Sequence, residues 1–259
     1  YFEDIEVVSF YESPKKRTFN FSEGFEEENF EINVTEERPS GTTFLFKDYF
    51  LDKIAKSDFI KPKYIKQRVL EEFYARLFQF KKNGEFVKIN IETNIGNIKN
   101  QAQILTEDIP EFTTVELKSF INLIDKFNLY YSIEEVDPLD SSLIAAITVD
   151  NRTVKVDLIA NENLPTGYQM VFLLYSDFFK GKIDLARQNL KISTQELKDI
   201  QNLFRKEVVS IIESKIPNIK DRNKDVRKSL VTRFPHLSGY FDTKNIGYVS
   251  RNEILKKAQ

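Results

Sequence analysis

Apolar positions recur at spacings of three and four in two long segments, the pattern of a helix with one buried face. The clearer segment follows Ser193-Thr194-Gln195-Glu196, a capping box in which a hydroxyl and a carboxylate each satisfy an orphan backbone N–H. Pro217 is expected to end this helix, whose apolar stripe is Leu197, Ile200, Phe204, Val208 and Ile211. The other segment begins at Pro62, where a missing N–H costs nothing, and ends at Asn83-Gly84. Its predicted apolar stripe is Ile65, Val69, Phe73, Leu77 and Phe80.

Apolar runs with a period of two, or without a polar break, predict β-strands on both sides of the Pro62 helix. Residues 1–49 predict four strands with no helix among them, so their apolar face needs a partner. The continuous run Phe44-Leu45-Phe46 predicts burial on both faces. Further strands are predicted at residues 86–92, about 102–105, 129–133, 142–149, 153–159 and 170–175, with a turn at Asp150-Asn151.

Two other segments predict helices, and together the elements set the fold class. Thr113-Thr114-Val115-Glu116 has the form of a helix start, and residues 220–234 predict a charged helix. The first would carry Leu117, Phe120, Ile121 and Ile124, and Ser250 would cap a last short helix. The elements predict an α+β protein of two-layer α/β sandwiches, in which the helix at 194–216 packs on a sheet. The predicted domains are residues 1–60, a connecting helix at 61–83, an α/β domain at 84–217 and a charged helical segment at 218–259 that leads to a further domain.

Composition narrows the chemistry that the chain can perform. Cysteine is absent and His236 is the only histidine, which excludes thiolate catalysis, zinc–thiolate sites, Ser-His-Asp triads and multi-His metal sites. The formal net charge of -2 argues against nucleic acid as a partner. No apolar run reaches the roughly 20 residues that span a bilayer, and the chain opens with no secretion leader. We expect a cytoplasmic protein, or a piece of one, with no membrane partner and no metal site.

Arg187 is the candidate functional residue that the pattern singles out. It lies in the connection between the buried run at 170–175 and the capped helix. A short connection of this kind can aim a guanidinium at one point, and its planar fork suits phosphate oxygens. The alternative is that Arg187 only donates to carbonyls and caps its own loop. Lys180 and Lys182 flank Gly181 and could assist an anion, or they could be solvated turn residues.

The order of the elements and two short motifs resemble the GHKL ATPases, the family that joins gyrase B, the ninety-kilodalton heat-shock chaperone, histidine kinases and MutL. Gly41-Thr42 is similar to the family's last nucleotide-box signature, where the Thr lies near the adenine. The stretch 183–191 is similar to the catalytic loop of the chaperone's middle domain. There Arg187 matches the Arg that reaches the γ-phosphate and Leu190 matches a Leu, whereas Lys191 departs from the pattern.

The resemblance implies a fold and an activity. Residues 1–60 would be the C-terminal strands of a GHKL nucleotide-binding domain, and 84–217 a transducer domain, ribosomal-protein-like with a left-handed crossover. The activity would be that of a chaperone-like ATPase, in which ATP-driven closure couples the two domains. Arg187 would sense the γ-phosphate, and Gly41 and Thr42 would bind the nucleotide. ATP and Mg²⁺ would be the cofactors of the protein that contains this chain, which we expect to be an ATP hydrolase.

Several parts of that machinery are missing from the chain. It has eight Gly and no Gly-x-Gly, so it lacks the family's Asp-x-Gly-x-Gly loop and Gly-rich lid, and it has no P-loop. The resemblance also requires a helix with a general-base Glu and a Mg²⁺-binding Asn, which lie in the N-terminal half of the nucleotide domain. That half is therefore an expected partner, and the chain alone is expected neither to bind ATP tightly nor to hydrolyse it.

Two other functions stay open. One is a MutL- or gyrase-like transducer that acts on DNA, and the other is a non-catalytic interaction module that keeps the fold. A basic cluster at 220–233 is either a solvated helix face or a surface for nucleic acid or an acidic partner. Thr42 could be an ordinary strand residue, and Glu26-Glu27-Glu28 is expected to be a solvated turn rather than a metal site. By analogy, the family implies a homodimer and allows a protein client.

Overall fold

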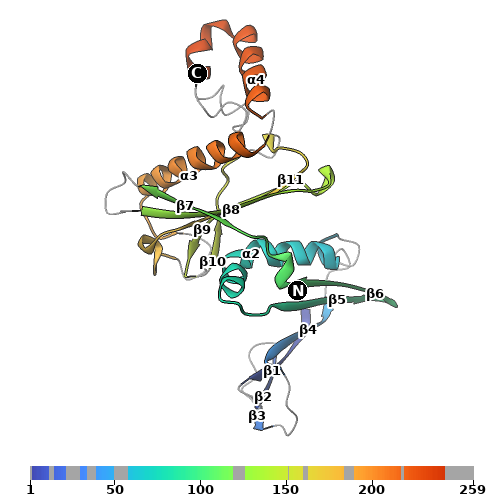
Figure 1. The fold of residues 1–259 in the computed structure, drawn as a ribbon. Helices are drawn as coiled ribbons and strands as arrows, with labels where there is room; N and C mark the ends of the chain where they lie inside the picture. Colours follow the sequence, from blue (N-terminus) through green and yellow to red (C-terminus); the bar gives the residue numbers. More distant parts are fainter. Residues whose placement is uncertain are drawn as a thin grey trace. The chain divides into compact units, whose positions relative to one another are not determined.

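The computed structural model describes most of the chain and divides it into two compact units. The described residues are 2–11, 15–21, 30–33, 39–49, 58–118, 126–150, 152–159, 163–183, 190–216 and 219–242. Unit 1 comprises Tyr1–Lys66 and Ile91–Ala102, and unit 2 comprises Gln67–Asn90 and Gln103–Gln259. Within the described residues the chain has three α-helices and separate β-sheets (Figure 1), so the predicted α+β class is confirmed. None of these helices has the length and apolar character that a membrane crossing requires.

Unit 1 is built around a four-stranded antiparallel sheet in the order β3-β2-β1-β4. The four strands predicted for residues 1–49 are confirmed. They are β1 (Phe2–Tyr11), β2 (Lys15–Phe21), β3 (Phe30–Asn33) and β4 (Gly41–Tyr49). Val7 of β1 pairs with Phe19 of β2 and with Phe44 of β4, so these three side chains share one face of the sheet.

This sheet keeps much of its apolar surface exposed. Among the residues of β1, β2 and β4 whose burial is described, only Val7 is buried. Phe44, Leu45 and Phe46 are 58%, 47% and 51% exposed, so the predicted burial of this run on both faces is wrong. A continuous apolar run is typical of a strand that lies between two layers. The described residues supply no such layer over either face of β4.

A two-stranded sheet joins β5 (Lys88–Ile95) to β6 (Ile98–Leu105). β5 extends three residues beyond the predicted strand at 86–92, and β6 begins four residues before the predicted strand at about 102–105. Gly96 forms the turn between the strands with φ +61°, a backbone angle that glycine adopts without a steric penalty.

Unit 2 contains a five-stranded mixed sheet in the order β10-β9-β11-β8-β7. β11 pairs in parallel with β9 and antiparallel with β8, so the chain crosses over between β9 and β11 and returns in the same direction. The sheet comprises β7 (Thr113–Lys118), β8 (Lys126–Glu135), β9 (Ser142–Val149), β10 (Arg152–Lys155) and β11 (Tyr168–Tyr175).

The helix predicted to begin at Thr113 is wrong, because residues 113–118 form strand β7. Val115 and Leu117 lie opposite Leu129 and Phe127 of β8, and their side chains join the core of unit 2. β-branched residues favour a strand, and pairing with β8 outweighs the helix-start pattern of residues 113–116. Phe120, Ile121 and Ile124 lie outside the described residues.

Helix α3 (Thr194–Lys215) packs on one face of the five-stranded sheet, as predicted. Ile200, Phe204 and Val208 are fully buried in the same cluster as Phe127 and Phe172 of the sheet. Burial of a side chain of this size contributes roughly 1.5–3 kcal/mol to the free energy of unfolding. The helix ends at Lys215, two residues before Pro217.

Helix α2 (Pro62–Lys82) covers the other face of that sheet (Figure 1). Phe78 lies 5.0 Å from the ring centroid of Tyr130 on β8 and 6.5 Å from that of Tyr175 on β11. The buried positions of the helix are Pro62, Leu70, Tyr74, Ala75, Leu77 and Phe78. Of the predicted stripe, Leu77 is buried and Ile65, Val69 and Phe80 are partly buried, whereas Phe73 is 51% exposed, so the prediction is wrong at Phe73. Apolar residues form two overlapping stripes on α2. The sheet buries the stripe that contains Tyr74 and Phe78 and not the one that contains Phe73.

The chain continues after α3 into helix α4 (Ile219–Arg233), which confirms the charged helix predicted for 220–234. A 3₁₀ segment at Pro235–Asp242 follows it. Leu230 and Phe241 are buried together in a small cluster that includes Val226 and Phe234. Ser250 and the helix predicted after it lie outside the described residues.

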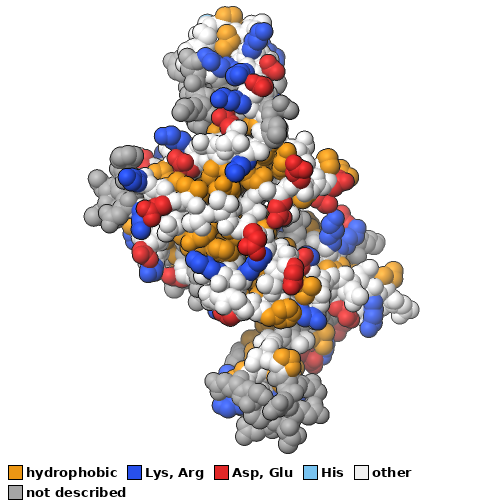
Figure 2. All heavy atoms as spheres, in the orientation of Figure 1, with side chains coloured by type: hydrophobic (Ala, Val, Ile, Leu, Met, Phe, Trp, Pro, Cys, Tyr) orange, Lys and Arg blue, Asp and Glu red, His pale blue; other side chains and the backbone are white. Residues whose placement is uncertain are grey.

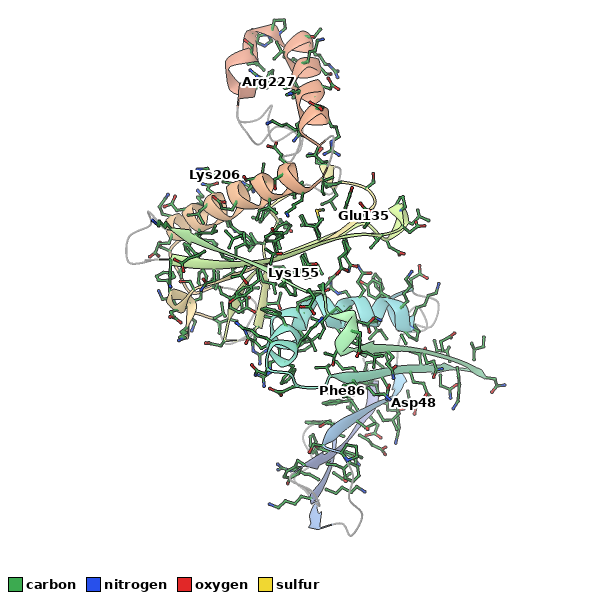
Figure 3. All side chains as sticks on the ribbon, in the orientation of Figure 1. Asp48, Phe86, Glu135, Lys155, Lys206 and Arg227 are labelled. Atoms are coloured by element: carbon green, nitrogen blue, oxygen red, sulfur yellow. The ribbon has the colours of Figure 1, made fainter. Side chains whose placement is uncertain are left out.

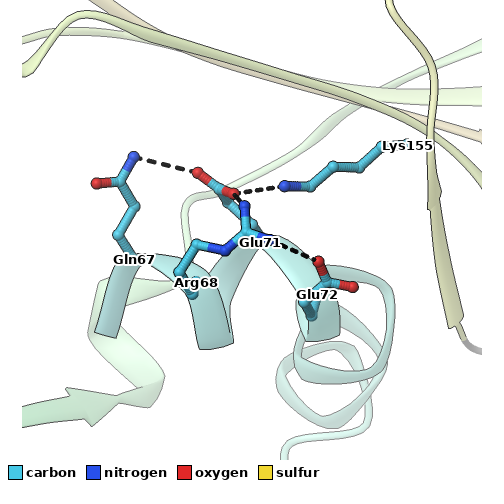
Figure 4. Close-up of polar contacts among 5 residues, drawn as sticks. All are labelled: Gln67, Arg68, Glu71, Glu72 and Lys155. Carbon is cyan, nitrogen blue, oxygen red and sulfur yellow. Dashed lines mark hydrogen bonds and ion pairs between the residues drawn. The ribbon is translucent and has the colours of Figure 1, made fainter. Parts of the chain in front are cut away.

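Glu71 joins α2 to the edge of the sheet through an ion-pair network (Figure 4). Its carboxylate accepts hydrogen bonds from Gln67 (3.1 Å) and Arg68 (2.8 Å) on the same helix and from Lys155 of β10. The Glu71 side chain is only 13% exposed, whereas those of Lys155 and Arg68 are 39% and 47% exposed. Solvent therefore screens the two cations, which limits the gain from each pair.

Glu71→Ala should lower the free energy of unfolding by about 1–2 kcal/mol, because it leaves Lys155 without its carboxylate partner and removes a half-buried contact. The matched control is Glu72→Ala, whose carboxylate is 49% exposed and pairs with Arg68 at 3.3 Å. The control should change the free energy by no more than about 0.5 kcal/mol. Urea denaturation measures both, and equal effects would contradict a special role for Glu71.

Candidate functional site

The connection between β11 and α3 follows a strand whose central five residues are buried. Met170, Phe172 and Leu174 of β11 have no exposed surface. After the strand, the Ser176 hydroxyl donates to the carbonyl of Lys126 at 3.2 Å and accepts the N–H of Phe178 at 3.3 Å. These bonds tie the start of the connection to the neighbouring strand β8.

The aromatic pair that follows anchors the connection in the core. Phe179 is fully buried, and its ring centroid lies 5.9 Å from that of Phe127 on β8. The neighbouring Phe178 packs against the same core cluster. These contacts fix the position of the chain from the end of β11 to Phe179.

Backbone contacts join the two ends of the segment that contains Arg187, and we call these joined ends its base. Ile183 and Leu190 form an antiparallel bridge, and the N–H of Lys191 donates to the carbonyl of Lys182 at 3.0 Å. Ile183 and Leu190 also pack against the core of unit 2. These contacts join the chain on the two sides of residues 184–189. Arg187 lies outside the described residues, so its role as a γ-phosphate sensor stays a prediction.

The N-terminus of α3 has the predicted capping box. The Ser193 hydroxyl accepts the N–H of Glu196 at 3.2 Å, and the Glu196 carboxylate accepts the Ser193 N–H at 2.9 Å and its hydroxyl proton at 2.6 Å. These hydrogen bonds, the hydroxyl first and then the backbone N–H, lower the pKa of Glu196. The chain that returns from Leu190 therefore enters a helix whose start is well defined.

The two lysines beside Gly181 interact with their own neighbours. Lys180 pairs with Asp177 at 2.8 Å, and this carboxylate raises the pKa of Lys180. The Lys182 ammonium lies 3.1 Å from the ring centroid of Phe178, a cation–π contact. These contacts favour turn residues over an anion site.

Asp150 is the residue at this site that sequence reasoning missed. The N–H of Gly181 donates to its carboxylate oxygen Oδ2 at 3.1 Å. The sequence predicts Asp150 only as part of the turn between two strands. Because 31 residues separate it from Gly181, no local pattern in the sequence could have pointed to this contact.

Gly41 and Thr42 lie in unit 1, at the start of β4. The Thr42 hydroxyl is 2.9 Å from that of Ser9 on β1. An open groove of about 350 Å³ lies over these strands, lined by Val7, Ser9, Tyr11, Arg17, Phe19, Thr42 and Phe44. A Cβ added at Gly41 would meet no atom within 4 Å, so the described residues give no steric reason for glycine there.

Acidic groups and the single histidine offer no metal centre in the part of the chain that is described. No group of three or more His, Asp or Glu side chains there is placed to hold a metal ion. His236 is exposed in the 3₁₀ segment after α4. Glu26, Glu27 and Glu28 fall outside the described ranges.

Comparisons with known proteins leave the family open. No protein-family model matches the sequence, and no curated protein matches it either. Among solved structures, the chain is similar to the B subunit of DNA gyrase from Myxococcus xanthus, with a TM-score of 0.35 and 12% identity. The likeness covers 80% of this chain and 68% of the gyrase chain. At this TM-score and identity it supports no inference about activity.

Glu196→Gln should remove an acid-sensitive contribution to stability. The pKa of Glu196 is lowered from its ordinary value of 4.5, so the contribution is complete above that value and is lost as pH falls through the lowered pKa. The difference in free energy of unfolding between the wild type and the variant should be larger near about pH 7 than near about pH 3. Urea denaturation at both pH values measures it, with Glu207→Gln on the same helix as the control. A difference that does not change with pH would contradict the assignment.

Proposed function

We propose that this chain is part of a cytoplasmic, chaperone-like ATPase of the GHKL type. In this proposal ATP and Mg²⁺ bind a nucleotide domain that includes β1–β4 and is completed by a partner segment. Closure of that domain then brings Arg187 to the γ-phosphate. A cation that arrives only in the closed state stabilises the transition state more than bound ATP.

The closed base of the Arg187 segment is the observation that carries the proposal. Between the bridge residues Ile183 and Leu190 the chain has only six residues. One side of the base continues from the buried strand β11, and the other continues into the capped helix α3. A short segment with both ends held limits where a guanidinium can go, which favours a directed contact over a general charge effect.

Unit 1 gives separate support through the groove beside Thr42. Phe19 and Phe44 offer ring surface for a flat aromatic group, and the hydroxyls of Ser9 and Thr42 offer hydrogen bonds to its polar edge. A nucleotide base can use contacts of both kinds. The groove is open in the described residues, which agrees with a site that needs a partner segment to complete it.

Arg187→Ala and Arg187→Lys should lower ATP turnover much more than nucleotide affinity in the protein that contains this chain. The loss could reach about 10³-fold, the lower range for an arginine that stabilises a transferring phosphoryl group. Lys should rescue little, because it lacks the planar fork. Steady-state turnover, nucleotide Kd by calorimetry and the melting temperature are measured together.

Arg205→Ala is the matched control for this experiment. Arg205 of α3 donates to the carbonyl of Leu158 at 2.9 Å, a contact that holds the helix to the rest of unit 2. Its loss should lower the melting temperature and leave turnover per folded molecule intact. Wild-type turnover in a correctly folded Arg187→Ala protein would end the phosphate-sensor hypothesis.

Helix α4 is the observation that favours the DNA-acting alternative. Lys220, Lys224, Arg227 and Lys228 recur at the spacing of one helix face and are exposed. Figure 2 shows Lys and Arg side chains gathered over this helix, and Figure 3 labels Arg227 on it. Asp221 offsets part of this charge, because it pairs with Lys224 at 3.1 Å.

The alternative predicts salt-dependent DNA binding that depends on α4. Replacing Lys220, Lys224 and Lys228 together by Gln should weaken binding and reduce the slope of log K against log salt by about three. The control replaces Lys198, Lys206 and Lys215 of α3 by Gln, which changes the net charge equally (Lys206 is labelled in Figure 3). Fluorescence anisotropy of labelled duplex DNA measures both. Equal effects of the two triple substitutions, or no binding at low salt, would exclude the alternative.

A further inference from the structure

Strand β4 forms an open edge of the four-stranded sheet in unit 1. In the order β3-β2-β1-β4 it pairs with β1 alone, so no described strand lies beside its outer row of backbone N–H and C=O groups. Every residue of Gly41–Phe46 is exposed. An unpaired edge of this kind is a template for another strand.

The two edges of this sheet differ in their protection against such pairing. β3, at the other edge, has only four residues and includes the charged Glu31. Short length and charge both discourage edge pairing. β4 has nine residues, and its run Gly41–Phe46 contains no charged residue and no proline. The threonine and phenylalanine residues of this run favour a strand, so β4 is the edge that can accept a partner.

The lysine that follows this run is held over β1. Lys47 donates to the Asp4 carboxylate at 3.2 Å and also to that of Glu6. Asp4 is its direct cross-strand partner on β1. A lysine on an edge strand commonly repels an approaching strand. Here two carboxylates of the neighbouring strand offset its charge, so Lys47 gives the edge little protection.

The sequence of β4 matches itself when two copies run antiparallel with Leu45 opposite Leu45. In this register Phe44 of one copy lies opposite Phe46 of the other, and Thr43 lies opposite Lys47. The apolar run therefore pairs only with itself, and no like charges lie opposite each other. Moving the axis to Lys47 would instead place two lysines in direct opposition, which destabilises a strand pair.

The same register joins the aromatic surfaces of the two sheets. Val7 of β1 lies opposite Phe44, and Ile5 lies opposite Phe46. The rings of Phe44 and Phe46 are stacked, with centroids 6.3 Å apart and an interplanar angle of 14°. Directly opposed residues of neighbouring strands point to the same face. Pairing would therefore continue one apolar row from Val7 and Phe44 to Phe46 and Ile5 of the second copy, and aromatic pairs across strands stabilise a sheet.

We propose that β4 is a self-association surface: two copies of this chain pair antiparallel along β4, with Leu45 on the two-fold axis, and form one eight-stranded sheet. The same strand serves both copies, so the contact closes as a dimer. The self-matching run makes a second copy the occupant of this edge. The pairing does not depend on the proposed function.

Cross-linking tests the register, because the chain contains no cysteine and a single introduced thiol has no background. Leu45→Cys places two thiols opposite each other across the axis, and a short bismaleimide should join two copies. Ile98→Cys is the matched control, because Ile98 on β6 is also an exposed apolar residue of unit 1. It should yield no more than random collisions produce. Equal cross-linking of the two variants would overturn the proposal.

Sedimentation velocity of the 259-residue chain measures the association itself, and the wild type should form dimers. Thr43→Lys sets a cation opposite Lys47 of the second copy and should weaken dimerisation by at least about tenfold. Thr43→Glu sets a carboxylate opposite the same lysine and should not weaken it. Ile98→Lys adds the same charge away from the edge and should match the wild type.

The results also separate this pairing from other forms of association. A wild type that stays monomeric at its highest soluble concentration would overturn the proposal and leave the edge to a strand of another protein. Oligomers larger than a dimer, or equal weakening by Thr43→Lys and Thr43→Glu, would overturn it as well. Circular dichroism checks that the sheet persists in each variant. If a charge at position 43 unfolds the sheet, the comparison of Leu45→Cys with Ile98→Cys decides.

Discussion

The burial of strand β11 on both faces is the constraint on which unit 2 depends. Met170, Phe172 and Leu174 face the core cluster shared with α3, and Val171 and Leu173 face the side covered by α2; all five are at most 1% exposed. β11 also provides the one parallel pairing of the described sheet, with β9. A strand that is buried on both faces cannot shift its register without moving an entire layer of side chains. The connection that follows it inherits this fixed position.

Elements with strong local signals could be predicted from the sequence, and those defined by distant partners could not. The capping box at Ser193 and the proline at 62 define helix starts through contacts within one turn. Residues 113–118 became a strand because β8 pairs with them, although their own sequence resembles a helix start. The buried face of α2 was misassigned for the same reason, since Phe73 and Tyr74 fit equally good stripes and only the sheet distinguishes them.

The same distinction between local signals and contacts with distant residues applies to the candidate site. The local sequence pattern indicates a short connection between a buried strand and a capped helix, and Arg187 lies in this connection. The contact that holds the connection from outside, between Asp150 and Gly181, depends on two turns that the fold brings together. The hydroxyl pair of Ser9 and Thr42 likewise joins positions 33 residues apart, through the pairing of β1 with β4. The predicted domain bounds are not tested by these contacts and stay a prediction.

In contrast to unit 2, unit 1 leaves much of the apolar surface of its sheet in contact with solvent. Its four strands bury one described side chain, Val7, while Phe44, Leu45 and Phe46 each keep about half of their surface in contact with solvent. A sheet stabilised mainly by its backbone hydrogen bonds is marginal in water, because the net gain from each bond is small and ordering each residue costs about 1–2 kcal/mol. Covering three such side chains would contribute several kcal/mol more, at roughly 25 cal/mol per Å² of apolar surface. In the proposed function, a partner segment that covers this face would stabilise the strands and close the groove beside Thr42 through the same contacts, and folding of this unit would then be coupled to completion of the proposed nucleotide site.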